Sequence, residues 1–191
     1  MANKKFRYGF KAEASRFATE LRTEMGIELN APLCPWKLAD HLCIPIIELS
    51  ELPNCEQRQY LTLGPGRDEF SATVCYDGTK AFVINNDAHP TKRQASNIAH
   101  ELAHVLMGHP PTAPFDETGK RDFIAEIENE AEWLGPTLLV SDQAAMQAYQ
   151  LIQWGRHTLT SLSDEWNVTK DVIQMRMNVV GASKRFKNRA A

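Results

Sequence analysis

Two histidines, His100 and His104, stand four residues apart in a stretch, residues 91–107, whose apolar side chains recur at helical spacing. Residues four apart lie on one face of a helix, so both imidazoles can bind one zinc ion. Glu101 directly follows the first histidine, where it can reach a water molecule beside the metal and act as a general base. Catalytic zinc sites take three protein ligands and leave one position open. The fold must therefore bring a third ligand to this helix from another element.

The ends of this helix are also marked in the sequence. Thr91 and Gln94 fit the pattern of an N-terminal capping box. Gly108 and Pro110 follow at the point where the helix should stop. His109 is expected to be a helix-end residue that the helix dipole favours.

The third ligand is expected on the next helix, within the acidic run 126–132. Glu130 falls near the centre of an apolar stripe and Glu126 lies at its edge, while Glu128 and Glu132 point away; the stripe comprises Phe123, Ile127, Leu134 and Leu138. A carboxylate that faces the core is costly unless it is paired, and a metal is a suitable partner. Glu130 is therefore the predicted third ligand, and Glu126 is the alternative.

The rest of the chain predicts an α+β fold with a small sheet and a helical C-terminal part. Helices are expected over residues 9–26, from Pro35, and over 122–139, 142–154 and 160–180, with a strand at 44–49, a loop at 50–69, and a hairpin of 71–76 and 81–84 around Asp77-Gly78.

The charge, the cysteine pattern and the distribution of apolar residues limit the partners and the cellular location that the sequence predicts. The net charge of −3 argues against a protein that depends on non-specific phosphate binding. The four cysteines form no C-x-x-C pair, the N-terminus has charges throughout, and no stretch of 18 apolar residues occurs. We expect a cytoplasmic protein with free thiols and no membrane span.

Two motifs resemble those of the ImmA/IrrE family of zinc metallo-endopeptidases and, more distantly, of the thermolysin-type gluzincins. The first is residues 93–109, with the core Ala99-His100-Glu101-Leu102-Ala103-His104, and the second is Glu128-Asn129-Glu130-Ala131, followed by Leu138-Leu139. The resemblance implies a zincin-like metalloprotease domain with a small mixed or antiparallel sheet, an active-site helix and a helical C-terminal part. It also implies Zn²⁺ as the cofactor and, as the third ligand, the Glu before the Ala of the second motif, which is Glu130. Glu132 departs from the family, which usually has Asn at that position.

By the same resemblance, residues 1–158 form the metallopeptidase domain and residues 159–191 a C-terminal helical extension packed on it. The expected function is a zinc endopeptidase that cleaves a regulatory protein, such as a helix-turn-helix repressor of a phage, mobile element or stress response. His157 and Tyr149 are possible donors to the oxyanion, although nothing in their spacing selects either.

Two other functions stay open. The segment Asn167-Val168-Thr169 resembles the turn of a helix-turn-helix, so a DNA-associated regulator with a zinc site and little protease activity is one alternative. It would contact DNA through Lys170, Arg176 and the basic tail, although the apolar residues around them can equally serve as packing residues. The other alternative is the protease or toxin partner of a toxin–antitoxin-like pair.

Overall fold

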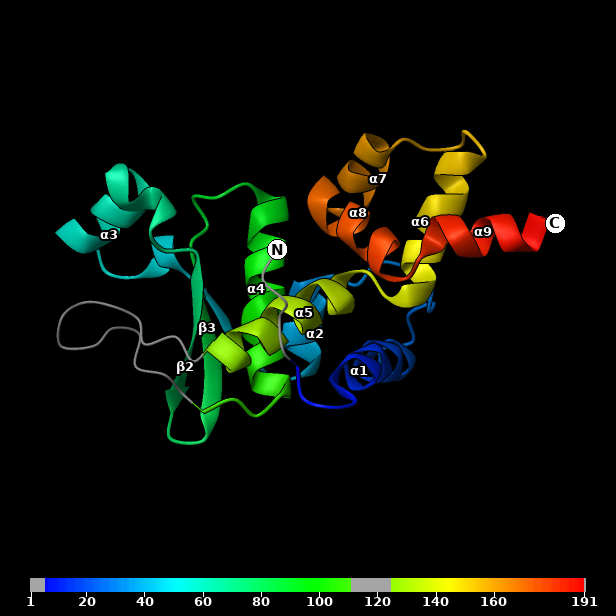
Figure 1. Cartoon of the computed structure of the whole chain (residues 1–191). Coiled ribbons are helices and arrows are strands. Elements are labelled where there is room, and N and C mark those ends of the chain that lie inside the picture. The colour runs from blue at the N-terminus through cyan, green and yellow to red at the C-terminus, as the bar shows by residue number, and fades with distance from the viewer. Residues whose placement is uncertain (1–5, 111–124, 191) are drawn as a thin grey trace.

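The computed structural model describes residues 6–110 and 125–190. Within these ranges the structure contains a three-stranded sheet, and helices precede and follow its strands along the chain (Figure 1). The helices are α1 (Phe10–Glu24), α2 (Pro35–His41), α3 (Glu56–Thr62), α4 (Thr91–Leu106), α5 (Ala125–Leu139), α6 (Asp142–Gln153), α7 (Leu159–Trp166), α8 (Lys170–Val179) and α9 (Ala182–Ala190). The strands are β1 (Ile46–Glu48), β2 (Ala72–Asp77) and β3 (Lys80–Asn85).

The sheet has the order β1-β3-β2, with β1 parallel and β2 antiparallel to β3. Val83 in the central strand lies opposite Ile46 on one side and Val74 on the other. The turn between β2 and β3 contains Gly78 at φ +61°, a conformation that glycine adopts without steric cost. The α+β class, the small mixed sheet and the hairpin are therefore confirmed, and β2 lies at one edge of the sheet.

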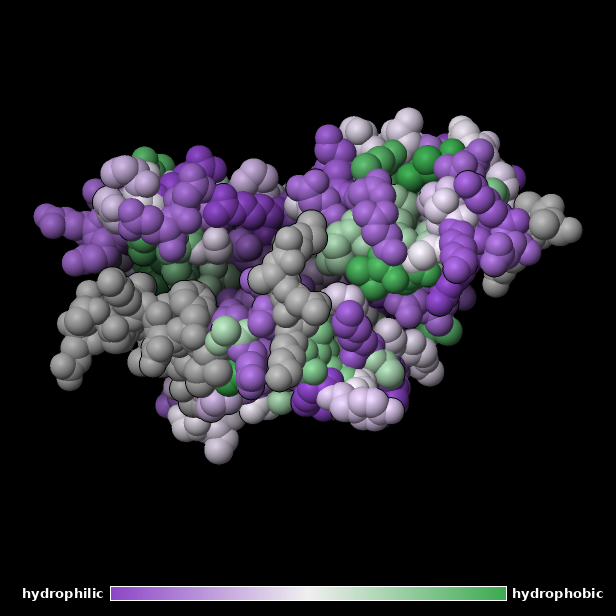
Figure 2. All heavy atoms as spheres, viewed as in Figure 1, coloured by the Kyte–Doolittle hydropathy of each residue, from purple (hydrophilic) through white to green (hydrophobic). Residues whose placement is uncertain are grey.

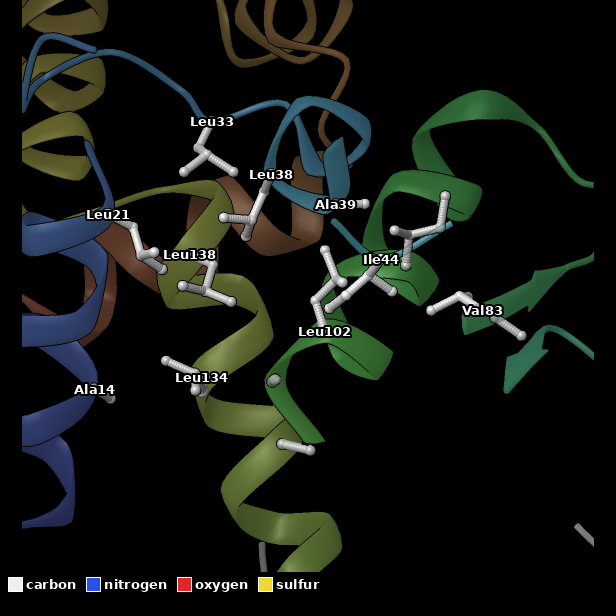
Figure 3. Packing of buried hydrophobic residues seen from close by; sticks show 14 of the residues in the cluster. Ala14, Leu21, Leu33, Leu38, Ala39, Ile44, Val83, Leu102, Leu134 and Leu138 are labelled. Carbon is white, nitrogen blue, oxygen red and sulfur yellow. The ribbon is translucent and has the colours of Figure 1, made fainter. Parts of the chain in front are cut away.

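Helix α4 lies between the sheet and α5, and its apolar side chains join both to one core. Leu102 of α4 packs among Val83 of β3, Ile44 and the leucines of α5 (Figure 3). The fully buried members of this cluster include Phe10, Ala14, Leu38, Ala39, Val83, Ile98, Leu102, Leu134 and Leu138. The core thus fixes α4 rigidly, with one face left for the histidines.

The C-terminal helices form a second apolar cluster that reaches the back of α4. Leu162, Val168 and Ile173 of this region pack with Ala99 of α4 and Leu139 of α5. Thr169 caps α8, since its side chain accepts a hydrogen bond from the Val172 N–H. The division at residues 158 and 159 stays a prediction.

The basic residues predicted to contact DNA differ in exposure. Arg176 is buried, and its guanidinium donates hydrogen bonds to the Val140 carbonyl and to Asp142. It therefore serves packing and not recognition. Lys170, Lys184, Arg185 and Lys187 are exposed, and hydrophilic side chains are frequent over α9 and α3 in the space-filling view (Figure 2).

Two local predictions are wrong. Residues 50–69 contain α3 and two short 3-10 turns instead of a loop; α3 has no buried residue, so no apolar period marks it. The predicted capping box does not form, because Pro90 occupies the cap position and the Thr91 hydroxyl donates to Asn167. Gln94 instead donates to the His89 carbonyl in the β3–α4 connection. Residues 111–124, which include Phe123, lie outside the described residues.

Close packing of α5 on α4 depends on Gly135, and its replacement gives a first prediction. A Cβ at this position would lie 3.1 Å from the backbone N of His100 and 3.2 Å from the carbonyl carbon of Ala99. Gly135→Val should therefore force the helices apart and lower the free energy of unfolding by about 2 kcal/mol. Urea unfolding checks this, and because valine has a higher helix propensity than glycine, helix propensity alone predicts no loss. An unchanged or increased free energy of unfolding would contradict the close-packing argument.

Candidate metal centre

The side chains of His100 and His104 from α4 and of Glu128 from α5 lie close together. The Nε2 atoms of His100 and His104 are 3.1 Å apart. From α5, one Glu128 carboxylate oxygen lies 3.3 Å from His100 Nε2 and the other lies 3.7 Å from His104 Nε2. Among the described residues, these three form the His/Cys/Asp/Glu group that could hold a metal ion.

Glu128, and not the predicted Glu130, lies beside His100 and His104 in this geometry. The face of α5 nearest α4 carries the small residues Ala131 and Gly135, both buried. Glu128 precedes them by three and seven residues, so it lies on that same face. Glu130 is two residues further on, about 200° around the helix, and cannot share that face. The leucine stripe marked the side that enters the core, while the small residues mark the side that approaches α4.

The three side chains lie close enough to hold one metal ion, since one ligand atom from each lies within 4.8 Å of the others. Ligand atoms on a tetrahedral zinc ion lie about 3.3 Å from one another, close to the 3.1 Å between the two histidine nitrogens. The neighbouring imidazoles of His100 and His104 hold the pKa of the Glu128 carboxyl well below its usual range through hydrogen bonding. Two imidazole nitrogens and a carboxylate converge on one point, which is a donor set that suits zinc.

Glu101 lies beside this group, on the side that faces the sheet. Its side chain is buried, and one carboxylate oxygen accepts a 2.8 Å hydrogen bond from the Val74 N–H of β2. The edge strand thus orients the carboxylate predicted to act as the general base. Burial and the negative charge of Glu101 together raise the pKa of Tyr76, a neighbouring residue of the same strand.

A cleft of about 620 Å³ opens onto His100, Glu101 and Glu128. Strand β2 and the residues before it form one part of the cleft lining. Apolar side chains from residues 49–61, which reach into α3, form another part. Its apolar lining includes Leu49, Leu52, Leu61, Phe70 and Ile84. The arrangement allows an extended chain to lie against β2 with one of its carbonyl groups next to the metal-ligating residues.

The other predicted residues lie elsewhere. Glu130 faces His109, with 3.3 Å between Oε2 and Nε2, and Glu126 is exposed. Nδ1 of His157 lies 3.5 Å from Oε2 of Glu165, and the ring of Tyr149 meets the ring of Phe186 edge-on. Neither His157 nor Tyr149 lines the cleft.

Sequence reasoning missed the role of two further groups. His109, expected only at the helix end, turns back and places its Nδ1 3.0 Å from Nδ1 of His104. Burial lowers its pKa. The Val74 N–H could not be found from side-chain motifs, because it is a backbone group whose position depends on how the sheet packs.

A comparison with known protein families found a match. Residues 59–178, more than half of the chain, match the model of peptidase family M78, described as the IrrE N-terminal-like domain. The chain belongs to this family. The resemblance read from the two motifs is therefore confirmed, and M78 is a family of metallopeptidases. The comparison with curated proteins found no match.

The M78 match begins within α3 and ends within α8, so it contains the edge strand, α4, α5 and most of the residues that line the cleft. Membership of this family supports peptidase activity. In the part of the chain that the structure describes, no helix is both long enough and apolar enough to cross a membrane.

Proposed function

We propose that the protein is a zinc-dependent endopeptidase. The observation that carries this proposal is the convergence of His100, His104 and Glu128 beside Glu101, at the floor of a cleft bordered by an edge strand. Membership of a metallopeptidase family supports the same reaction class.

Each group has a distinct task in peptide hydrolysis. His100, His104 and Glu128 would hold the ion, which supplies Lewis-acid activation of water and of the scissile carbonyl when bound. Glu101 takes a proton from the attacking water and gives it to the departing amine. The Val74 N–H keeps the Glu101 carboxylate in one orientation during both transfers.

The edge strand suggests how the substrate lies. An extended peptide can lie along the edge strand of a sheet. Residues of β2, among them Thr73 and Cys75, line the cleft next to His100. This mode requires an unfolded or extended segment in the substrate, as a regulated linker between domains would provide.

For the substrate class, we propose a regulatory protein, such as a helix-turn-helix repressor. The M78 family is associated with zinc metallopeptidases that cleave repressors, which supports this choice. Cells that produce the wild-type protein or a Glu101→Gln variant can be compared by mapping new protein N-termini. New termini within a transcriptional regulator, seen only with the wild type, are expected; their absence in every regulator would contradict the assignment.

The apolar wall predicts a preference for an apolar side chain next to the cleaved bond. Leu61→Ala should lower kcat/KM for such peptides about tenfold, because part of the pocket surface is lost. Leu63→Ala is the matched control, since Leu63 lies two residues away with 87% of its surface exposed. Mass spectrometry of a digested peptide library gives both the cleavage sites and the relative rates. Equal effects of the two substitutions would contradict the assignment of this wall to substrate binding.

A further inference from the structure

A chain of side chains that do not line the cleft leads from His104 through the buried His109 and Glu130 to the half-exposed Arg7. Nδ1 of His104 lies 3.0 Å from Nδ1 of His109, and Nε2 of His109 lies 3.3 Å from Oε2 of Glu130. Oε1 of Glu130 in turn accepts a 3.1 Å hydrogen bond from Nε of Arg7. The side chains of His104, His109 and Glu130 are only 11%, 7% and 14% exposed.

The backbone explains why His109 reaches His104. Gly108 adopts φ +64° at the end of α4, a conformation suited to glycine. The chain then reverses, and the His109 N–H donates to the His104 carbonyl at 3.0 Å. Glu130 reaches the same place from α5, on the side of the helix that Glu128 does not use.

The contacts assign one proton arrangement. His104 can offer a lone pair at Nε2 to a metal only if its proton is on Nδ1. That proton is then donated to Nδ1 of His109, so the proton of His109 sits on Nε2 and is donated to Glu130. Glu130 accepts at both oxygens, from His109 and from Arg7. Every polar atom in the chain therefore has one role that fits its neighbour.

We propose that His109 and Glu130 are positioning residues that hold His104 in its metal-binding tautomer and orientation, with Arg7 fixing Glu130. Outer partners of this kind orient ligand histidines and typically change metal affinity 10–100-fold when removed. This inference rests on the metal site of the proposed function, but not on peptide cleavage.

Zinc affinity of the full-length protein, measured by competition with a chromophoric chelator, tests the proposal. His109→Leu removes the acceptor for His104 at similar volume, so we expect zinc affinity to fall 10–100-fold, with one ion still bound at saturation. His109→Asn keeps an acceptor oxygen close to the position of Nδ1, so its affinity should stay within about threefold of the wild type. This rescue separates positioning from a general packing defect, and circular dichroism checks that the variants fold.

Glu130→Gln tests the contact between Glu130 and His109. We expect a loss of about tenfold in zinc affinity in the wild-type background and no further loss in the His109→Asn background, because the chain is already cut there. Glu126→Gln is the matched control, since it removes one carboxylate from an exposed position of the same helix.

Several results would overturn the proposal. Unchanged zinc affinity in His109→Leu would show that His104 needs no partner, and equal losses in His109→Leu and His109→Asn would show that packing alone matters. A wild-type protein that binds zinc but cleaves no peptide would refute the proposed function and leave this inference standing. A wild-type protein that binds no zinc would refute both.

Discussion

Glu101→Gln should reduce peptide cleavage about 10²–10⁴-fold while zinc stays bound, because general acid–base catalysis typically contributes that factor. The amide oxygen of glutamine can still accept the Val74 N–H, so the local structure should persist. The amide cannot take a proton from water at neutral pH. The loss should therefore fall on kcat, with little change in KM.

The measurement is kcat and KM for one peptide, with zinc content determined on the same samples. Glu126→Gln on α5 is the control for loss of one carboxylate from the exposed surface, and it should cleave as the wild type does. Cleavage by Glu101→Gln at the wild-type rate would remove Glu101 from the reaction. If the protein instead regulates its target by binding alone, Glu101→Gln should leave its effect in cells unchanged.

Glu128→Gln should weaken zinc binding about 10²–10³-fold, since one of three protein ligands is lost. The estimate shares the binding free energy of a zinc site equally among its ligands. His104→Ala should have an effect of the same size. Glu130→Gln should cost about tenfold, because Glu130 acts only through His109 and His104.

Elemental analysis after dialysis, followed by chelator competition, measures this difference. The expected order of zinc affinity is wild type, then Glu130→Gln, then Glu128→Gln. The reverse order for the two glutamates would restore Glu130 as the ligand. Equal and complete zinc loss in both would show that the carboxylates share the ion.

Much of the fold could be predicted because the signals are local. Gly26 and Gly108 end α1 and α4 at positive φ, and Gly78-Thr79 forms the turn between β2 and β3, directly after Asp77. Helix α3 gave no such signal, because it is exposed and its place depends on contacts such as those of Arg58 with the Ser50 and Leu52 carbonyls. The capping box failed for a related reason, since Asn167 from the distant C-terminal region binds the Thr91 hydroxyl.

Part of the candidate site could likewise be predicted from local sequence signals, and the rest depends on the tertiary structure. The sequence by itself determined that His100 and His104 lie side by side with Glu101 next to them, because spacing along one helix places both histidines on one face without help from the rest of the fold. Only the tertiary structure decided which glutamate joins them. The azimuth of α5 against α4 depends on where Ala131 and Gly135 let the two backbones approach, and that contact selects Glu128 and turns Glu130 to His109. Periodicity within one helix reveals its faces, but the packing of two helices determines which face meets the metal-binding side chains.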